Sequence, residues 1–365
     1  MIIMERIKII AFYLPQFHPF PENDEWWGKG FTEWTNVAKA KPLFRGHYQP
    51  KIPSDLGFYD LRLPIVREEQ AKLAREAGVY GFCYWHYWFG QKQLMNDIID
   101  DVLDSGEPDF PFCLGWANES WKAKLWNKDG RGDKTLIEQT YGGLEDYRAH
   151  FDYAKRLFKD KRYIRIDGKP FFLIYRPNDF ADCAMFIELW NKWAKEEKIS
   201  DGVYFVANMD KDSDYPSLIS MGFDAVTPSM KSRTDISDSR STIIKRYKSL
   251  EHKLRNRPFC DDFEMVSRRL WRDEMDMEEN VFPFLIPNWD HSPRSGKNAR
   301  VFIGSTPEAF QKQAESIISK VKAKHHNILM LKSWNEWGEG NYMEPDLKFG
   351  KGYIAALRNV LEKAD

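Results

Sequence analysis

The sequence predicts one α/β domain over residues 1–365, built as a (β/α)8 TIM barrel with long βα loops. Eight short apolar runs alternate with amphipathic stretches along the whole chain, and no Pro/Ser-rich linker marks a domain boundary. The connections after the runs are long and rich in polar aromatic residues, whereas those before the runs are short. A barrel whose site is built from its βα loops has this asymmetry. A doubly wound sheet is the alternative architecture.

The expected strands are runs of four to eight residues in which apolar side chains dominate. They are Ile7 to Leu14, Val79 to Trp85, Phe112 to Trp116, Phe171 to Tyr175, Tyr204 to Asn208, Ala225 to Pro228, Phe282 to Pro287 and Ile328 to Trp334. The expected helices lie between these runs and carry apolar residues at helical spacing. They are Leu63 to Ala77, Asn96 to Leu103, Tyr147 to Lys159, Asp182 to Lys195, Tyr215 to Met221, Thr242 to Leu254, Pro307 to Lys322 and Tyr353 to Lys363.

Three connections after strands are long, namely His18 to Leu61, Asn118 to Glu145 and Trp289 to Ser305. Connections before strands are short, as in Glu76 to Gly78 and Asp167 to Pro170. We therefore expect a functional site at the mouth formed by the carboxyl ends of the strands.

The composition favours a small neutral ligand. The 54 basic and 55 acidic residues almost cancel, so neither nucleic acid nor a membrane surface is an expected partner. Aromatic residues make up 15% of the chain, with 14 Trp and 16 Tyr, and many stand beside Asn, His and Glu at the ends of apolar runs. Aromatic rings stack on sugar rings while polar neighbours bond the hydroxyls, which makes carbohydrate the expected partner. Ordinary packing is the alternative role for these rings.

No cofactor is expected from the motifs present. The four cysteines are widely spaced and form neither a disulfide framework nor a zinc spacing. His18, His86 and His291 could gather near the mouth, yet no HxH or HExxH spacing supports a metal site. The sequence also has no Gly-rich phosphate loop and no GxSxG elbow.

The N-terminal residues lack the basic and apolar segments of a secretory signal, and no apolar run approaches the ~18 to 20 residues of a membrane span. We expect a reducing, cytoplasmic setting, or a periplasmic or secreted one if the N-terminus has been trimmed. No sequence feature predicts an oligomeric state.

Two carboxylates, Glu336 and Glu339, lie three residues apart after the last expected strand, between tryptophans and glycines. In a helical turn, positions i and i+3 face the same way with Cβ atoms roughly 5 to 6 Å apart. The pair can then reach opposite sides of one small substrate and act as acid and base on a sugar. The alternative is that one Glu caps a helix and the other is a solvated surface charge.

If the strands close into a barrel, the residues at their carboxyl ends converge on one mouth. Most are aromatic or polar, and the candidates for sugar contact are Tyr13, Trp85, His86, Trp116, Asn118, Glu119, Tyr175, Asn208, Trp289, Asp290, Trp334 and Asn335. We expect a polar aromatic bowl. Singly, each candidate also has a structural interpretation: Trp85 can pack beneath a helix, and Asn208 can bond a loop carbonyl.

At these residues the chain resembles a known family. Trp334 to Gly340 followed by Asn341 to Pro345 is similar to the Asn-Glu-Trp-His-Glu-Gly and Glu-Pro signature of glycoside hydrolase family 99, the endo-α-mannosidases and endo-α-mannanases. The WbsX-type group of bacterial polysaccharide loci, often labelled glycosyltransferases, is closer still. Its pattern resembles Ala11 to His18, Gly30 to Trp34 and Gly81 to Trp88, and the similarity runs from about Lys8 to Glu362.

The resemblance implies a (β/α)8 barrel and a retaining glycoside hydrolase. By motif, Glu336 matches the family's base, which acts on the sugar's 2-hydroxyl, and Glu339 matches its general acid/base, with a 1,2-anhydro sugar as the proposed intermediate. The segment Pro287 to Arg294 resembles a family loop that places Asp290 and Arg294 at the site, and Tyr342 belongs to the same signature. Position 338 is Gly where family 99 has His, so specificity for α-mannosides does not transfer.

Two other functions stay open at this point. A glycosyltransferase of O-antigen or capsule polysaccharide biosynthesis needs ligands for a donor nucleotide, and Asp210-Lys211-Asp212 has the Asp-x-Asp form, although a solvated turn is the favoured interpretation. A carbohydrate-binding barrel without catalysis needs the bowl but no carboxylate pair. For the hydrolase, we expect Glu339 to be kept partly protonated by aromatic desolvation and by the like charge of Glu336.

Overall fold

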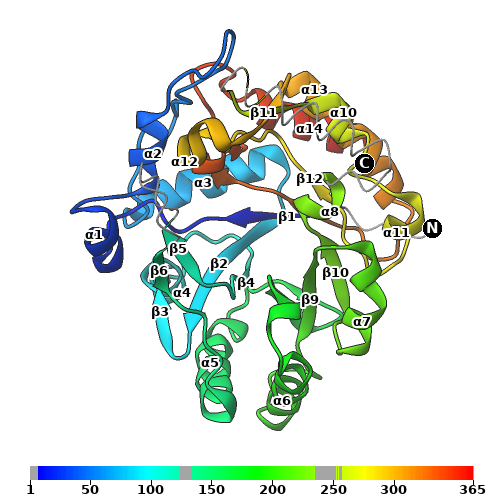
Figure 1. Cartoon of the computed structure of the whole chain (residues 1–365). Helices are drawn as coiled ribbons and strands as arrows, with labels where there is room; N and C mark the ends of the chain where they lie inside the picture. Colours follow the sequence, from blue (N-terminus) through cyan, green and yellow to red (C-terminus); the bar gives the residue numbers. More distant parts are fainter. Residues whose placement is uncertain (1–6, 124–133, 235–251, 253, 255–256, 365) are drawn as a thin grey trace.

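The computed structural model describes residues 7–123, 134–234, 252, 254 and 257–364. Its centre is a ring of parallel strands in chain order (Figure 1). They are β1 (Lys8–Tyr13), β2 (Gly81–Phe89), β4 (Phe112–Trp116), β8 (Lys169–Ile174), β9 (Tyr204–Met209), β10 (Ala225–Pro228), β12 (Phe284–Leu285) and β14 (Ile328–Leu331). Because β14 pairs in parallel with β1, the sheet returns on itself. The predicted barrel fold is confirmed.

Helices cover the outside of the ring close to their expected positions. They are α3 (Pro64–Ala77), α4 (Asn96–Ser105), α5 (Gly143–Phe158), α6 (Cys183–Glu196), α7 (Tyr215–Ser220), α13 (Pro307–Val321) and α14 (Gly352–Ala364). The expected helix at 242–254 lies largely outside the described residues. The C-cap Gly78 shows why the connection before β2 is so short. Its φ of 82° is a left-handed conformation that ends α3, and β2 begins at Gly81.

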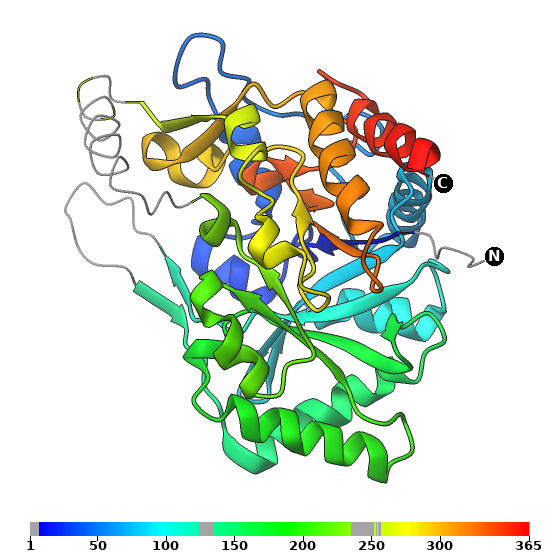
Figure 2. The same ribbon diagram turned by 90° about the vertical axis from the view of Figure 1, so that its right-hand side faces the viewer.

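The βα connections carry additional elements. After β1 come α1 (Pro21–Trp27) and α2 (Glu33–Lys39), after β2 comes β3 (Lys92–Leu94), and after β4 come β5 (Trp121–Ala123) and β6 (Lys134–Ile137). After β10 come α8 (Met230–Thr234), β11 (Phe259–Asp262), α10 (Phe263–Ser267) and α11 (Asp273–Asp276), and after β12 come α12 (Ser292–Ser295) and β13 (Arg300–Ile303). In Figure 2, α12 and the β5–β6 pair lie to the left of the barrel, whereas the start of β1 and the end of α14 lie to the right.

The seam between β10 and β12 is where the barrel is least complete. Val226 of β10 pairs with Val281, which lies just before β12. The amide of Val226 donates to the carbonyl of Asn280, and the amide of Phe282 donates to the carbonyl of Val226, both at 2.8 Å. Between β10 and β12 the barrel is therefore joined by a single bridge. The other pairs of neighbouring strands share ladders of two or more residue pairs.

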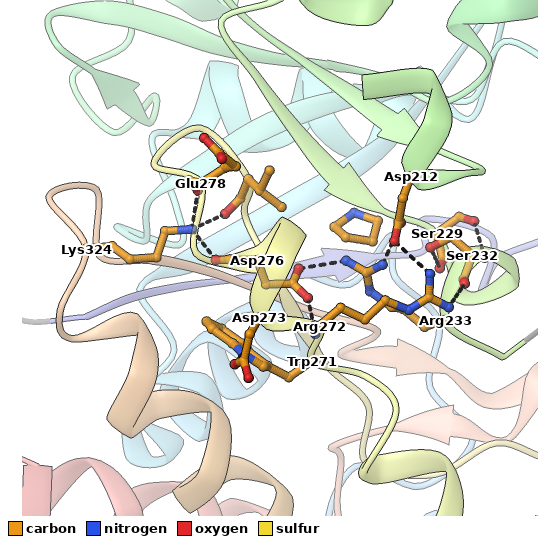
Figure 3. Close-up of polar contacts among 12 residues, drawn as sticks. Asp212, Ser229, Ser232, Arg233, Trp271, Arg272, Asp273, Asp276, Glu278 and Lys324 are labelled. Carbon is orange, nitrogen blue, oxygen red and sulfur yellow. Dashed lines mark hydrogen bonds and ion pairs between the residues drawn. The ribbon is translucent and has the colours of Figure 1, made fainter. Parts of the chain in front are cut away.

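A buried polar network reinforces this seam (Figure 3). The guanidinium of Arg233, on α8, donates to Asp212, which follows β9, and to Asp276 on α11, each at 2.7 Å. The side chains of Arg233 and Asp276 are fully buried. Lys324, which follows α13, donates to the carbonyls of Asp276, Glu278 and Val281 at 2.6 to 2.7 Å. The network thus joins segments on both sides of the seam.

Candidate active site

The sequence after β14 folds into a tight hairpin that presents both carboxylates. Strand β15 (Asn335–Glu336) pairs antiparallel with β16 (Asn341–Tyr342), and the 3-10 turn η4 (Trp337–Glu339) joins them. Gly340 closes the turn with a φ of 55°, a conformation that glycine adopts without strain. Glu336 immediately precedes the turn and Glu339 ends it, and both side chains reach the guanidinium of one arginine, Arg294.

One guanidinium lies between the two carboxylates. Arg294, on α12, donates from Nη1 to Glu339 at 2.7 Å and from Nη2 to Glu336 at 2.9 Å. Its Nε donates to a third carboxylate, Glu33 on α2, at 3.1 Å. The Nε2 of His291 lies 3.5 Å from Glu339. Three loops of the barrel, after β1, β12 and β14, therefore meet at one cationic group.

The two carboxylates differ in proton affinity. Burial raises the pKa of Glu336 well above its usual value; the charges of Glu339 and Glu33 add to this and Arg294 opposes it. Burial also acts to raise the pKa of Glu339, but the hydrogen bond from His291 and the charge of Arg294 outweigh it and lower that pKa. These directions favour a proton on Glu336 over one on Glu339. They run opposite to the sequence-based expectation of a partly protonated Glu339, because His291 and Arg294 both stabilise the ionised form of Glu339.

Aromatic rings form a wall beside the pair. Phe12, from β1, stacks on Trp85 with ring centroids 4.7 Å apart, and Trp85 meets Tyr175 edge to face at 5.4 Å. Trp289 lies nearly parallel to His291, 6.2 Å away. Glu339 is among the charges that act on the hydroxyl of Tyr175, which places this wall near the carboxylates. Trp85, Tyr175 and Trp289 are each partly exposed.

Hydrogen bonds and ion pairs connect the residues that follow β4, β8 and β9 at the rim of the barrel's mouth. Asn118 accepts from the amide of Arg176 at 2.7 Å and donates to its carbonyl at 2.9 Å. The guanidinium of Arg176 contacts Glu119 at 3.2 Å and Asp210 at 2.7 Å. Asn208 donates to the carbonyl of Tyr175 at 3.2 Å, which matches the structural interpretation given above for this residue. Glu119 is the most exposed of the predicted contacts at this rim.

Four of the predicted contact residues turn away from the mouth. The Tyr13 hydroxyl donates to Gln70 of α3 at 2.7 Å, and His86 bonds His150 of α5 at 2.9 Å. Trp116 packs against His150, Phe180 and Phe186 on the helix layer. Trp334 is fully buried against Phe82. Successive strand residues point to opposite faces, so a strand end that sends Trp85 into the lumen sends His86 toward the helices.

Three further predicted residues are buried and form hydrogen bonds within the protein that connect the loops of the mouth. Asn335 is fully buried and bridges to Leu14, accepting from its amide at 2.8 Å and donating to its carbonyl at 3.0 Å. The hydroxyl of Tyr342 donates to Asp346 at 2.6 Å, and its ring stacks on Trp337 at 3.8 Å. Asp290 is buried and accepts hydrogen bonds from the loop after β1, so its carboxylate is occupied by protein groups.

Sequence reasoning did not single out Glu33, His291, Glu344 or Lys332 as site residues. Glu344 accepts from Trp337 at 2.6 Å, and burial raises its pKa to about 7. The Nζ of Lys332 donates to the carbonyl of Pro228 at 2.9 Å and lies 4.6 Å from the ring of Phe284. Burial lowers the pKa of Lys332 to about 7, and the charge of Asp210 opposes this effect. The signal for Glu33 and Glu344 was present, because both stand in motifs that carry the family resemblance.

Asp210-Lys211-Asp212 leads into a partly solvated turn in which Lys211 is exposed, and both carboxylates of the segment are paired with arginines. Asp212 accepts from Arg233 and Arg272, each at 2.7 Å (Figure 3), and Asp210 pairs with Arg176. Within the described ranges, no cluster of three or more His, Cys, Asp or Glu side chains has the arrangement of a metal site. None of the helices in the described part of the chain has the length and apolarity to cross a bilayer.

Comparisons with known proteins agree with this architecture. The model of a protein family described as "Glycosyltransferase WbsX" matches residues 9–357. Two curated relatives, both described as the uncharacterized protein WxcX, come from Xanthomonas campestris pv. campestris strains B100 and ATCC 33913 and are 35% identical over 371 and 369 residues. The match covers 98% of this chain and 50% of each relative, so the chain spans about half the length of the curated relatives it matches.

Two solved structures share the fold. A "glycoside hydrolase-like protein" has a TM-score of 0.62 at 14% identity, with 98% of this chain and 94% of that chain covered. The GH99 endo-α-mannosidase of Bacteroides thetaiotaomicron, in complex with bis-tris-propane, has a TM-score of 0.58 at 16% identity, with 97% and 96% covered.

Proposed function

This chain belongs to the WbsX family, and we propose that it is a retaining glycoside hydrolase acting on a bacterial polysaccharide or oligosaccharide. The observation that carries the proposal is the pair Glu336 and Glu339, which share the guanidinium of Arg294 at the mouth of the barrel. Retaining hydrolysis of a glycosidic bond requires one carboxyl group as acid and one as base or nucleophile. The partly exposed rings of Trp85, Tyr175 and Trp289 supply surfaces on which a sugar can stack.

Such chemistry requires the pair to carry one proton. Glu339 is the proposed acid that protonates the departing oxygen, and Glu336 is the proposed base that removes the proton of the neighbouring 2-hydroxyl. The oxygen of that hydroxyl then attacks the anomeric carbon as the bond to the leaving group breaks, and water later opens the anhydro sugar. Burial raises the pKa of Glu336 while His291 and Arg294 lower that of Glu339, so a proton taken up by the ligand-free pair favours Glu336 and must pass to Glu339 before bond cleavage. A sugar hydroxyl that displaces Arg294 from Glu339 favours this transfer, because it removes the charge that stabilises the ionised form of Glu339.

Two variants test the proposal. We expect Glu336→Gln and Glu339→Gln each to lower the turnover number on a glycan that the wild type cleaves at least ~10³-fold, while binding of the sugar stays measurable. A substrate with an activated leaving group needs little acid assistance, so it should restore much of the rate to Glu339→Gln and little to Glu336→Gln. Rescue of Glu336→Gln alone reverses the two roles, and near-normal turnover in either variant removes that residue from the mechanism.

The glycosyltransferase is the second candidate, because the family description carries that word. Its weakness is the Asp-x-Asp segment, where Asp212 is held by two arginines and Asp210 by Arg176. Calorimetry with nucleotide sugars, with and without Mn²⁺, separates the two activities: tight, metal-dependent binding of a nucleotide sugar favours the transferase. A sugar-binding barrel without catalysis is the outcome if glycans bind and none is cleaved or extended.

A further inference from the structure

Glu33 reaches the site because α2 is packed on the catalytic hairpin. Thr32 caps the helix by accepting from the amide of Trp34 at 3.2 Å. The ring of Trp34 then packs on Trp337 of η4, with centroids 5.6 Å apart, and its Nε1 donates to the carbonyl of Tyr59 at 2.7 Å. The first turn of α2 is thereby fixed against η4. The Glu33 side chain, only 6% exposed, points into the same buried space as Arg294.

The contact with Glu33 completes the coordination of Arg294. Each of the three guanidinium nitrogens donates to a different carboxylate: Nε to Glu33, Nη1 to Glu339 and Nη2 to Glu336. The guanidinium is planar with its N–H groups in a fixed fork. A bond at Nε sets the rotation of that plane, and the rotation decides where the two Nη groups lie. Glu33 therefore determines whether Arg294 can contact both members of the pair.

Gly338 makes room for this arrangement. A Cβ built at position 338 would collide with Oε2 of Glu33 and lie 2.9 Å from Nε of Arg294. The φ of Gly338 is outside the left-handed region, unlike that of Gly340, so its backbone conformation is open to other residues. The absence of a side chain at 338 is required by space, and the carboxylate of Glu33 fills that space.

We propose that Glu33 is a positioning residue of this site, and that its carboxylate, seated against Gly338, holds the guanidinium of Arg294 in contact with both Glu336 and Glu339. The expected effect on activity rests on the proposed function, because it requires Glu336 and Glu339 to be catalytic. The positioning of Arg294 by Glu33 does not depend on that function. The charge of Glu33 has a second effect, because it is one of the groups that raise the pKa of Glu336. Glu33 thus acts on Glu336 in two opposite ways, because by holding Arg294 in place it also maintains the larger pKa-lowering effect of the guanidinium.

The first experiment removes the charge and keeps the shape. In Glu33→Gln, we expect kcat on a glycan that the wild type cleaves to fall on the order of 10 to 10²-fold with little change in KM. Arg294 then no longer holds Glu336 and Glu339 in place, whereas the contacts with the sugar are unchanged. The limb of the pH profile that belongs to Glu336 should move to higher pH, because Glu336 loses the charge of Arg294, whose effect on its pKa exceeds that of Glu33. Glu25→Gln, an exposed glutamate on α1, is the matched control and should behave as wild type. A limb that stays in place or moves to lower pH in Glu33→Gln overturns the proposal, because Arg294 then keeps its contact with Glu336 without Glu33.

A readout without turnover separates this inference from the proposed function. Infrared difference spectra during a pH titration report a protonated carboxyl group, and the band that is absent in Glu336→Gln belongs to Glu336. We expect the midpoint of that band to rise in Glu33→Gln, because Glu336 loses the charge of Arg294. If no glycan is ever cleaved but the midpoint rises, the hydrolase is wrong and the role of Glu33 stands. An unchanged or lower midpoint contradicts the role of Glu33 in either case.

The space argument is tested by a double-mutant cycle. Gly338→Ala should displace Glu33 and Arg294 and cost about as much activity as Glu33→Ala, whereas Gly338→Ala in the Glu33→Ala background should add little, because the space is then free. Thermal melts of each variant show that the fold is retained. Fully additive losses overturn the proposal, as does a crystal structure of Gly338→Ala in which Arg294 keeps its three contacts.

Discussion

The backbone amide of Asp290 donates a 2.8 Å hydrogen bond to the carbonyl oxygen of Glu339. This bond ties the loop after β12 to the hairpin that carries Glu336 and Glu339 after β14. The carboxylate of Asp290 in turn accepts from His47 at 2.8 Å and from Gln49 at 2.7 Å, both in the loop after β1. Asp290 therefore joins the loops after β1, β12 and β14. We expect it to hold these loops in position and not to contact a sugar.

Asp290→Asn tests this role. The amide has one acceptor oxygen in place of two, so a buried donor of His47 or Gln49 loses its partner, at a cost of about 2 to 3 kcal/mol in unfolding free energy. We expect a lower Tm together with reduced turnover, measured by calorimetric melts and steady-state assay. The exposed Asp201→Asn is the control. A variant with normal Tm and lower affinity for sugar would instead identify Asp290 as a substrate contact.

The pH dependence of stability gives a second check on Asp290. Burial acts to raise its pKa, but the hydrogen bond from His47 and the charge of Lys51 outweigh burial and hold the pKa well below its usual range. The stabilising effect is therefore fully present above about pH 4, the unfolded value, and is lost as the pH falls toward the folded pKa. Wild type should lose more stability than Asp290→Asn between pH 4 and pH 2.

Arg233→Met should destabilise the barrel at its seam. The substitution leaves Asp276 as an unpaired carboxylate at a fully buried position, and breaking a buried pair costs about 3 to 5 kcal/mol. Denaturant titration of the variant measures the loss. Arg268→Met removes an exposed arginine that pairs with Glu264 and should change little. The double variant Arg233→Met/Asp276→Asn should recover part of the loss, and equal stability of the single and double variants would argue against an ion pair at the seam.

Lys332→Met should stabilise the protein, and more so at low pH. Burial depresses the pKa of Lys332 to about 7; the charge of Asp210 opposes this and Arg233 adds to it. The folded protein thus carries a penalty below pH 7 that fades as the pH rises toward the unfolded value of about 10.4. We expect a gain of roughly 1 to 3 kcal/mol at pH 6 that shrinks by pH 9.5. The exposed Lys29→Met is the control, and a gain independent of pH contradicts the assignment.

The strands were predictable because barrel strands are buried on both faces and read as apolar runs. Phe112–Trp116 and Ala225–Pro228 have the bounds that the sequence predicts. The strand expected at Phe282 to Pro287 is shorter, Phe284–Leu285, since a ladder also needs a partner, and β10 supplies only the bridge at Val226. Pairing of this kind depends on residues far away in the chain.

The site was predictable in its carboxylates and only partly in its surroundings. Glu336 and Glu339 follow from a local turn, so three residues of spacing fix their relation. At the end of a strand, one of two neighbouring residues points into the lumen and the other points toward the helices. The sequence alone does not show which, so both Trp85 and His86 were predicted to face the lumen. Glu33 comes from a loop after the first strand and meets Arg294 only through tertiary packing, which no local pattern encodes.

The contact between Gly338 and Glu33 also restricts the order in which substitutions can arise. Any side chain gained at 338 while Glu33 is present disrupts Arg294, whereas loss of Glu33 opens space at 338 before anything occupies it. A descendant of this protein can therefore acquire a histidine at 338 by one sequence of changes and is blocked along the other. Positions 33 and 338 are therefore sterically coupled, although they lie near opposite ends of the chain.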